Sequence, residues 1–328
     1  MALLPMEAVV PEPLFSVVVP AYNAGAFLSD ALRSVVQQVA DLPCEIIVVD
    51  DGSTDDSATI AGAHPGVRLL RQDNAGPARA RNRGIAAARA ELIFFLDADD
   101  RSEPGRFDRQ ARYMLANPSI DLSFGNWRVE NEPGSYLRRY GLEGPPDRFV
   151  ELEAPLARLL ADGCFVPTST VAARRSALLS AGGFPEDRRY AEDYALWLRL
   201  AAAGRFAFLD APLAWYRTAS PGRLTLSDDT YLGLVMTLRE ALAAYGASLD
   251  AAAGAKAAGR YAAAVNALLR HDWAYGGRQR VCDRMIALEP FLPEELRRKY
   301  WLASFVPAAV PRTARHLLHR ASRLAQGT

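Results

Sequence analysis

The sequence predicts an α/β fold in which a mostly parallel sheet carries helices on both faces, followed by a helical region. Over residues 15–100, short apolar runs alternate with amphipathic helical runs, which is typical of parallel strands joined by right-handed crossovers. After about Ser227 the composition changes to alanine-rich helical segments without an extended strand-like run. These two observations divide the chain into a part that contains a sheet and a part that is helical.

The hydrophobic periodicity places the individual elements. Apolar or alternating runs predict strands at residues 15–20, 45–50, 67–71, 92–96, 121–127, 168–173, 205–209 and 213–217. Amphipathic runs predict helices at residues 27–39, 57–63, 77–90, 104–116, 151–161 and 192–203, and turn residues predict an exposed loop at 131–147. We therefore expect an N-terminal extension at residues 1–13, a sheet domain at 14–226 with halves at 14–100 and 101–226, and a helical region at 227–328.

Composition and charge exclude several classes of protein. Half of the 328 residues are hydrophobic, and 38 Lys and Arg balance 38 Asp and Glu, so neither disorder nor nucleic-acid binding is indicated. The three cysteines, Cys44, Cys164 and Cys282, are too widely spaced to indicate a disulfide framework or a zinc site. No signal peptide is evident, and no run reaches the roughly 18 apolar residues that a membrane span requires. A cytoplasmic protein is expected.

The C-terminal segment, residues 296–328, contains seven Lys and Arg and no acid, with aromatic and leucine residues between them. Two interpretations remain open. A basic amphipathic segment can lie on an anionic membrane surface, here the inner face of the plasma membrane. It can also be a helical subdomain that packs its aromatic residues inward and leaves its arginines in solvent.

Acidic residues follow two of the predicted strands. Asp97, Asp99 and Asp100 come directly after the strand at 92–96, and an Asp pair follows the strand at 45–50. Because the carboxyl ends of parallel strands share one edge of a sheet, these acids are expected to line a common crevice. Clustered carboxylates repel one another unless a cation lies between them, which favours a hard divalent ion carrying a diphosphate. The alternative is a solvated turn with an Asp helix cap.

Three further features at the same edge fit a nucleotide diphosphate. Tyr22 can lie against a flat base, and Asp51 can accept a hydrogen bond from a uracil imide or a ribose hydroxyl. The loop at 74–76 leads into a helix that carries Arg79, Arg81 and Arg83, which places guanidinium groups near the phosphates. The alternatives are a rim aromatic, a turn with a helix cap, and a solvated helix face. These alternatives do not explain why the features recur at successive strand ends.

Several segments together resemble the inverting family 2 glycosyltransferases with the GT-A fold. The segments are Ser-Val-Val-Val-Pro-Ala-Tyr-Asn at 16–23, Val-Val-Asp-Asp-Gly-Ser-Thr-Asp at 48–55, Asn-Ala-Gly at 74–76, Ala-Arg-Asn-Arg-Gly at 80–84, Leu-Asp-Ala-Asp-Asp at 96–100, Gly-Gly-Phe at 182–184 and Glu-Asp-Tyr-Ala-Leu-Trp-Leu-Arg at 192–199. The resemblance covers about residues 14–217.

The resemblance implies a set of roles. Asp193 matches the general base, and a divalent metal, Mn²⁺ or Mg²⁺, would be held by Asp97, Asp99 and Asp100. The substrate contacts that it implies are Pro20, Tyr22, Asp51, Asn74, Gly76, Arg81, Asp97 and Glu192. The usual donor of the family is a UDP-sugar.

Inversion at the anomeric carbon requires such an arrangement. The acceptor hydroxyl attacks from the face opposite the departing diphosphate, so the base must lie across the sugar from the metal. An alternative for the Glu192-Asp193 pair is a helix start favoured by the dipole. One departure from the family pattern is that no histidine follows Tyr216-Arg217, so Arg217 or Arg223 is the candidate for a phosphate contact there.

The expected function is transfer of a sugar from a UDP-sugar to a hydroxyl of a saccharide or lipid-linked saccharide, in surface polysaccharide or glycoconjugate synthesis. The sequence disfavours three other functions. A nucleotidyltransferase would carry a Gly-rich, Arg-containing loop after the first strand, and the sequence lacks it. A binding protein that has lost turnover usually loses a site acid, whereas Asp51, Asp99 and Asp193 are all present. A dinucleotide dehydrogenase is disfavoured because no GxGxxG follows the first strand.

Overall fold

The computed structural model describes residues 12–39, 42–129, 136–217, 228–288 and 293–304. The chain divides into two compact units, Met1–Arg260 and Tyr261–Thr328. The predicted boundary at residue 226, most of the predicted extension at 1–13 and most of the basic segment at 296–328 lie outside the described residues.

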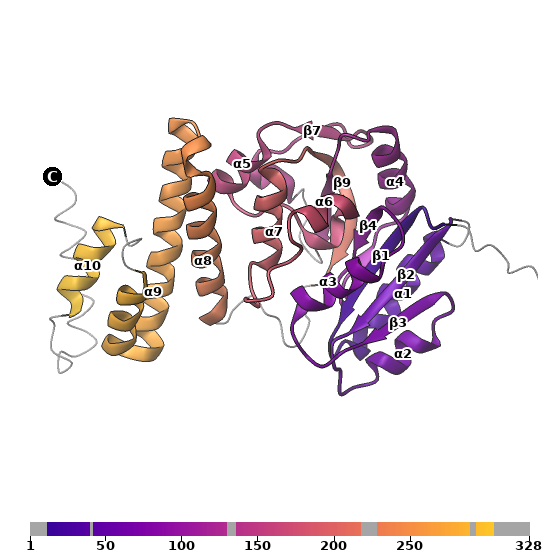
Figure 1. Cartoon of the computed structure of the whole chain (residues 1–328), viewed down its shortest axis with the longest axis horizontal. Helices are drawn as coiled ribbons and strands as arrows, with labels where there is room; N and C mark the ends of the chain where they lie inside the picture. The colour runs from indigo at the N-terminus through magenta and orange to yellow at the C-terminus, as the bar shows by residue number, and fades with distance from the viewer. Residues whose placement is uncertain (1–11, 40–41, 130–135, 218–227, 289–292, 305–328) are drawn as a thin grey trace, which may run out of the picture. The chain divides into compact units, whose positions relative to one another are not determined.

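Nine strands of the described residues form one mixed sheet in the first unit (Figure 1). They are β1 (Phe15–Ala21), β2 (Cys44–Asp50), β3 (Val67–Arg71), β4 (Leu92–Phe95), β5 (Arg101–Ser102), β6 (Leu122–Val129), β7 (Val150–Leu152), β8 (Ala172–Arg174) and β9 (Phe206–Tyr216). Their spatial order is β3-β2-β1-β4-β8-β6-β9-β5, and β7 pairs with β9. Strands β1 to β4 are parallel, β6 is parallel to β9, and each antiparallel pair involves β5, β7 or β8. The predicted α/β fold is confirmed.

Helices connect the strands and continue into the C-terminal part. Those of the first unit are α1 (Gly25–Val39), α2 (Ser57–Ala63), α3 (Pro77–Ala87), α4 (Arg106–Ala116), α5 (Pro155–Asp162), α6 (Arg175–Ser180), α7 (Glu192–Ala201) and α8 (Asp228–Tyr245), with short 3₁₀ helices η1 (Leu137–Tyr140), η2 (Thr168–Thr170) and η4 (Gly246–Ser248). Helix α9 (Ala251–Leu288) runs into the second unit, which also contains α10 (Glu294–Ser304). No helix of the described residues combines the length and the apolar character needed to cross a membrane.

Alternation along β1 assigns the helices to the two faces of the sheet. Val17 and its neighbours on the same face pack into a core with apolar residues of α1, α2 and α4. Val18 points to the other face, where a Cβ at Gly84 of α3 would lie 2.3 Å from its Cγ1. Phe95 at the end of β4 contacts the Trp197 ring of α7 at 6.4 Å between centroids. Helices α1, α2 and α4 therefore cover one face, and α3 and α7 cover the other.

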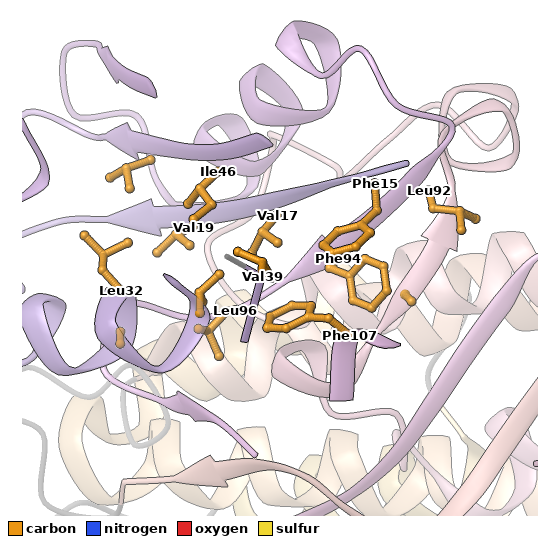
Figure 2. Close-up of a cluster of buried hydrophobic side chains, with 14 of the residues drawn as sticks. Phe15, Val17, Val19, Leu32, Val39, Ile46, Leu92, Phe94, Leu96 and Phe107 are labelled. Atoms are coloured by element: carbon orange, nitrogen blue, oxygen red, sulfur yellow. The ribbon is translucent and has the colours of Figure 1, made fainter. Parts of the chain in front are cut away.

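Three phenylalanines join the first strands to α4 (Figure 2). The rings of Phe15, Phe94 and Phe107 lie 4.9 to 5.7 Å apart between centroids, and all three are fully buried. Aromatic side chains contribute the largest buried areas in a core, and apolar burial stabilises by roughly 25 cal/mol per Å². This cluster fixes β1 and β4, whose carboxyl ends carry predicted site residues.

Two expectations for the second half of the sheet are wrong. The strands predicted at 205–209 and 213–217 are one strand, β9, whose pairing with β6 shifts register around Asn126. The Asn126 side chain donates a hydrogen bond of 2.6 Å to Asp210, which supports the chain through that irregularity. The strand predicted at 168–173 begins as the 3₁₀ helix η2, and only β8 pairs.

The loop expected at 131–147 and the helix expected at 151–161 also differ from the prediction. Leu137 and Leu142 are buried and anchor the described part of the loop around η1, while most of its other residues are exposed as predicted. Residues 150–152 form β7, and the helix begins at Pro155. The loop differs from the prediction because its turn-rich sequence also contains apolar side chains that become buried. The helix starts later than predicted because residues 150–152 pair in the sheet.

Glu45 at the start of β2 ties three segments together. Its carboxylate accepts hydrogen bonds of 2.6 Å from Ser16 Oγ and from the Arg89 backbone N–H, and its side chain is 8% exposed. Burial acts to raise the pKa of Glu45, but the hydrogen bonds from Ser16 and Arg89 outweigh it and hold the pKa below its ordinary value.

We predict that Glu45→Gln lowers the free energy of unfolding by about 1–3 kcal/mol at pH 7, because a buried backbone donor loses its charged acceptor. Since the folded-state pKa is lowered, this contribution is present above the unfolded pKa of about 4.3 and is lost as the pH falls through the folded value. Urea denaturation at several pH values measures it. Glu153→Gln, at an exposed position, is the control, and an equal effect of both changes would contradict the prediction.

Candidate functional site

The loops that follow β1 and β2 are locked together at the carboxyl edge of the sheet. The Asn23 backbone N–H donates to Ser53 Oγ at 3.0 Å, and Asn23 Oδ1 accepts from the Thr54 N–H at 2.9 Å. Asn23 adopts a left-handed conformation with φ 48°, which Asn tolerates better than most residues. The Gly25 N–H donates to Asp55 at 2.8 Å. The edge that carries Tyr22 and Asp51 is therefore preorganised.

Asp51 is buried and holds the loop at 74–76. Its Oδ1 accepts from Gln72 Nε2 at 2.7 Å and from the Ala75 N–H at 2.9 Å, and its Oδ2 accepts from the Gly76 N–H at 2.8 Å. Gly52 has φ 74°, and a Cβ there would lie 2.8 Å from Asn74 N, so the two loops touch at backbone distance. Asp51 thus has a structural task beside the base contact that was predicted for it.

The predicted contacts at the rim differ in exposure. Tyr22 is 52% exposed and Asn74 is exposed, while Pro20 is partly buried and Gly76 is buried. An exposed aromatic ring beside a fixed loop is available to a flat ligand.

Arg81 is the centre of the site. It is only 6% exposed, and its guanidinium donates to Asp97 Oδ1 at 2.7 Å through Nη2 and to Glu192 Oε1 at 2.8 Å through Nη1. Its charge also lies 5.3 Å from the centre of the Phe184 ring. Burial acts to lower the pKa of Arg81, but the charges of Asp97 and Glu192 outweigh it and raise the pKa. Arg81 therefore stays charged and joins the strand-end acids to the first turn of α7.

The solvated-helix interpretation fits the neighbours of Arg81 and not Arg81 itself. Arg79 has a side chain that is 63% exposed, with Glu186 at 4.0 Å. Arg83 is exposed and donates to the Arg71 carbonyl. Arg79 and Arg83 are therefore solvent-exposed, whereas Arg81 between them is buried.

The acidic loop after β4 is held by its neighbours. Asp100 is 2% exposed and accepts from Ser169 Oγ at 2.6 Å and from the Arg217 N–H at 3.2 Å. The Asp97 N–H donates to Ser169 Oγ at 3.1 Å, and Arg217 Nε donates to the Asp99 carbonyl at 3.2 Å. Burial, and then the charges of Asp97 and Asp99, raise the pKa of Asp100 well above its ordinary value. The three carboxylates are close enough to repel one another.

That repulsion and the oxygen donors fit a hard divalent cation. The described residues contain no ready group of three or more His, Cys, Asp or Glu side chains that could hold a metal ion. Arg81 already engages one oxygen of Asp97, and Ser169 engages Asp100. Sites that bind a metal through one or two carboxylates plus substrate phosphates do not need a complete protein cage.

Glu192 and Asp193 begin α7, after Ala191 in a left-handed conformation with φ 56°. Asp193 Oδ2 accepts from Thr168 Oγ1 at 2.9 Å. Burial, and then the charge of Asp193, raise the pKa of Glu192 to about 7 against the opposing effect of Arg81. Acids in a first helical turn are favoured by the helix dipole, so the structural and functional interpretations of this pair are compatible.

The structure brings the predicted acids together through residues that the sequence analysis did not single out. Adjacent residues of η2 reach both groups, with Thr168 bound to Asp193 and Ser169 bound to Asp97 and Asp100. The run of hydroxyl residues at 168–170 inside an apolar stretch was the available signal.

Asn82 was also missed. Its amide accepts from the Phe184 N–H and donates to the Phe184 carbonyl, both at 2.8 Å. A Cβ at Gly183, which has φ 68°, would lie 2.6 Å from Asn82 Oδ1. The Gly-Gly-Phe segment therefore docks against α3 next to Arg81. Arg223, the other candidate for a phosphate contact, lies outside the described residues.

Residues 16–180 match the sequence profile of glycosyl transferase family 2. The chain belongs to this family. The matched residues include the acids at both strand ends, Arg81 and η2, whereas Glu192 and Asp193 follow the matched region.

Relatives and solved structures agree with this assignment. The chain is 35% identical over 218 residues to the uncharacterized protein MT1568 of Mycobacterium tuberculosis, covering 62% of this chain and 66% of the relative. It is 30% identical over 224 residues to an uncharacterized glycosyltransferase of Rickettsia felis, covering 67% of this chain and 36% of the relative. The chain therefore spans between about a third and two thirds of the length of these relatives.

A crystal structure of S. aureus TarS 1-349 in complex with UDP-GlcNAc has a TM-score of 0.60 to this chain at 21% identity, covering 88% of this chain and 79% of the other. At this identity the likeness establishes the fold. It agrees with the predicted GT-A class.

We predict that Arg81→Gln lowers the free energy of unfolding by about 3–5 kcal/mol, because Asp97 and Glu192 lose the charge between them. Arg79→Gln, two residues away on the same helix and largely exposed, should change it by less than about 0.5 kcal/mol. Urea denaturation followed by circular dichroism measures both. If Arg81→Gln lowers the free energy of unfolding no more than Arg79→Gln does, the ion pairs of Arg81 do not stabilise the site.

Proposed function

We propose that this protein transfers a sugar from a nucleotide-diphosphate donor, with UDP as the carrier, to a hydroxyl of a saccharide or lipid-linked saccharide, with inversion at the anomeric carbon. One observation carries the proposal: Arg81 and η2 join the acids at the end of β4 to Glu192 and Asp193, which come from a distant part of the chain. The carboxylates that would hold the metal with the leaving diphosphate then belong to the same site as the carboxylate that would accept the proton of the attacking alcohol. Family membership and the UDP-GlcNAc complex of TarS support the choice of donor.

Each residue has a defined task in this proposal. Tyr22 lies along the base, and Asp51 and the loop at 74–76 contact the base and ribose. Asp193 accepts the proton of the attacking hydroxyl, and Thr168 orients its carboxylate. Glu192 stands beside it and anchors Arg81.

Asp97 and Asp99 would hold Mn²⁺ or Mg²⁺ together with the diphosphate, with Asp100 beneath them fixed by Ser169. A divalent cation bound there neutralises charge that develops on the leaving diphosphate. Arg217 is the phosphate contact that this loop offers. Its backbone N–H donates to the Asp100 side chain, and its Nε donates to the Asp99 carbonyl.

We propose further that this transfer takes place at the inner face of the plasma membrane and serves surface polysaccharide or glycoconjugate assembly. The basic composition of residues 296–328 supports contact with an anionic surface. Flotation with vesicles containing anionic lipid, with and without residues 296–328, tests that part. Equal flotation of both proteins would reject it.

We predict that Asp193→Asn lowers kcat by about 10²-fold or more while UDP binding is unchanged. The amide oxygen can still accept from the Tyr194 N–H, and the amide NH₂ can donate to Thr168 Oγ1, so the change removes the base and leaves both neighbours with a hydrogen-bond partner. Release of UDP from a panel of UDP-sugars with a panel of acceptors measures turnover, and calorimetry measures UDP binding. Asp108→Asn, on the surface of α4, is the control. Undiminished turnover of Asp193→Asn would refute the base assignment.

We predict that EDTA abolishes transfer by the wild-type protein and that Mn²⁺ or Mg²⁺ restores it. Asp99→Asn should raise the metal concentration for half-maximal activity by about tenfold or more, because one charged oxygen ligand is lost. Titration of activity with Mn²⁺ measures the shift. Full activity in EDTA would remove the metal from the proposal without touching the assignment of Asp193.

A further inference from the structure

Four aromatic side chains form a continuous group that has no part in the proposed donor binding, metal binding or base catalysis. They are Tyr216 at the end of β9, Trp127 in β6, Tyr136 before η1 and Tyr140 within it, here called the aromatic band. The rings of Trp127 and Tyr216 stack at 4.2 Å between centroids, Trp127 and Tyr136 lie 4.8 Å apart, and Tyr136 and Tyr140 lie 5.3 Å apart. All four are partly exposed, so the band is not part of the closed core.

Two members of the aromatic band are connected through the chain to the two acidic parts of the site. At one end, Tyr216 immediately precedes Arg217, whose backbone N–H donates to Asp100 at 3.2 Å. Further along the band, Tyr136 Oη donates to the Cys164 carbonyl at 3.2 Å, and four residues after Cys164 the chain reaches Thr168, which binds Asp193.

Electrostatics agree with this placement. Burial chiefly raises the pKa of Tyr136, and the charge of Asp193 adds to the rise. Burial likewise raises the pKa of the Cys164 thiol, with Asp193 as the next cause. Tyr136 therefore remains a neutral hydroxyl beside the proposed base.

We propose that the aromatic band is the acceptor subsite, and that it binds a pyranose ring through the ring face that presents C–H groups. This inference rests on the proposed function and adds the acceptor class to it. A flat aromatic surface favours a rigid sugar ring, because it offers apolar contact area to the C–H face of that ring. The hydroxyls of Tyr136 and Tyr140, 3.2 Å apart, supply polar groups beside the stacked rings. A ring held along the band has its hydroxyl directed toward Asp193.

Binding of unreactive sugars tests the subsite without knowledge of the natural acceptor. The probes are cellobiose, chitobiose, lactose and maltose, each titrated into the full chain in the presence of UDP and Mn²⁺ and followed by saturation-transfer NMR. At least one disaccharide should bind, and Trp127→Leu should weaken it about tenfold or more, while Trp127→Phe, which keeps an aromatic face, restores most of the affinity. UDP affinity should be the same in all three proteins.

Tyr113→Leu is the matched control, because Tyr113 stacks on Phe149 at 4.4 Å in a comparable aromatic pair between α4 and the segment before β7. It should leave disaccharide binding unchanged. If Trp127→Leu fails to fold, Tyr140→Leu takes its place with the same expectation.

The inference is overturned if no disaccharide binds the wild-type protein, or if Trp127→Leu binds as well as Tyr113→Leu. It is also overturned if an oligomer of glycerol phosphate binds and the disaccharides do not. If the wild-type protein transfers sugar to an acceptor and Trp127→Leu has the same KM for that acceptor, the subsite is rejected and the proposed function stands. Absence of any turnover together with absence of UDP binding would reject the proposed function itself.

Discussion

The buried guanidinium of Arg81 is the interaction on which the site depends. A charge removed from water is tolerated only when it is paired, and here the two partners come from the end of β4 and the start of α7. Helix α3 must therefore pack on the sheet with Gly84 against Val18, and α7 must dock beside it, before the charge is satisfied. Asn82, bound to the Phe184 backbone one residue along α3, strengthens the same junction. Fold and site are stabilised by the same contacts.

A second connection runs through hydroxyl groups. Ser169 contacts the acidic loop and Thr168 contacts Asp193, so a three-residue 3₁₀ helix sets the spacing between the two groups of carboxylates. Burial, and then the charges of neighbouring acids, raise the pKa values of Asp100 and Glu192. The neutral hydroxyls hold the carboxylates in place without cancelling their charge, which both the proposed cation site and the proposed general base require.

The family match ends at residue 180, before Glu192 and Asp193. Their link to the donor half is made by Arg81 and η2, which both lie inside the matched region. The aromatic band joins the two halves on the other side, since Trp127 belongs to the matched region and Tyr216 does not. An acceptor subsite built from both parts is compatible with variation in the acceptor while the donor half stays the same.

The sequence by itself determined the α/β class, most elements of the nucleotide half and the acidic residues at the strand ends, because period-two and helical patterns and strand-end acids are local signals. It did not show that residues 168–170 form a turn, that β9 is one strand, or that Leu137 and Leu142 are buried, since sheet pairing and burial depend on distant partners. The helical pattern placed three arginines on α3, and only the family resemblance named Arg81 among them. Only the tertiary structure decided that Arg81 is buried between Asp97 and Glu192 while Arg79 and Arg83 face solvent, because that choice depends on where α7 packs.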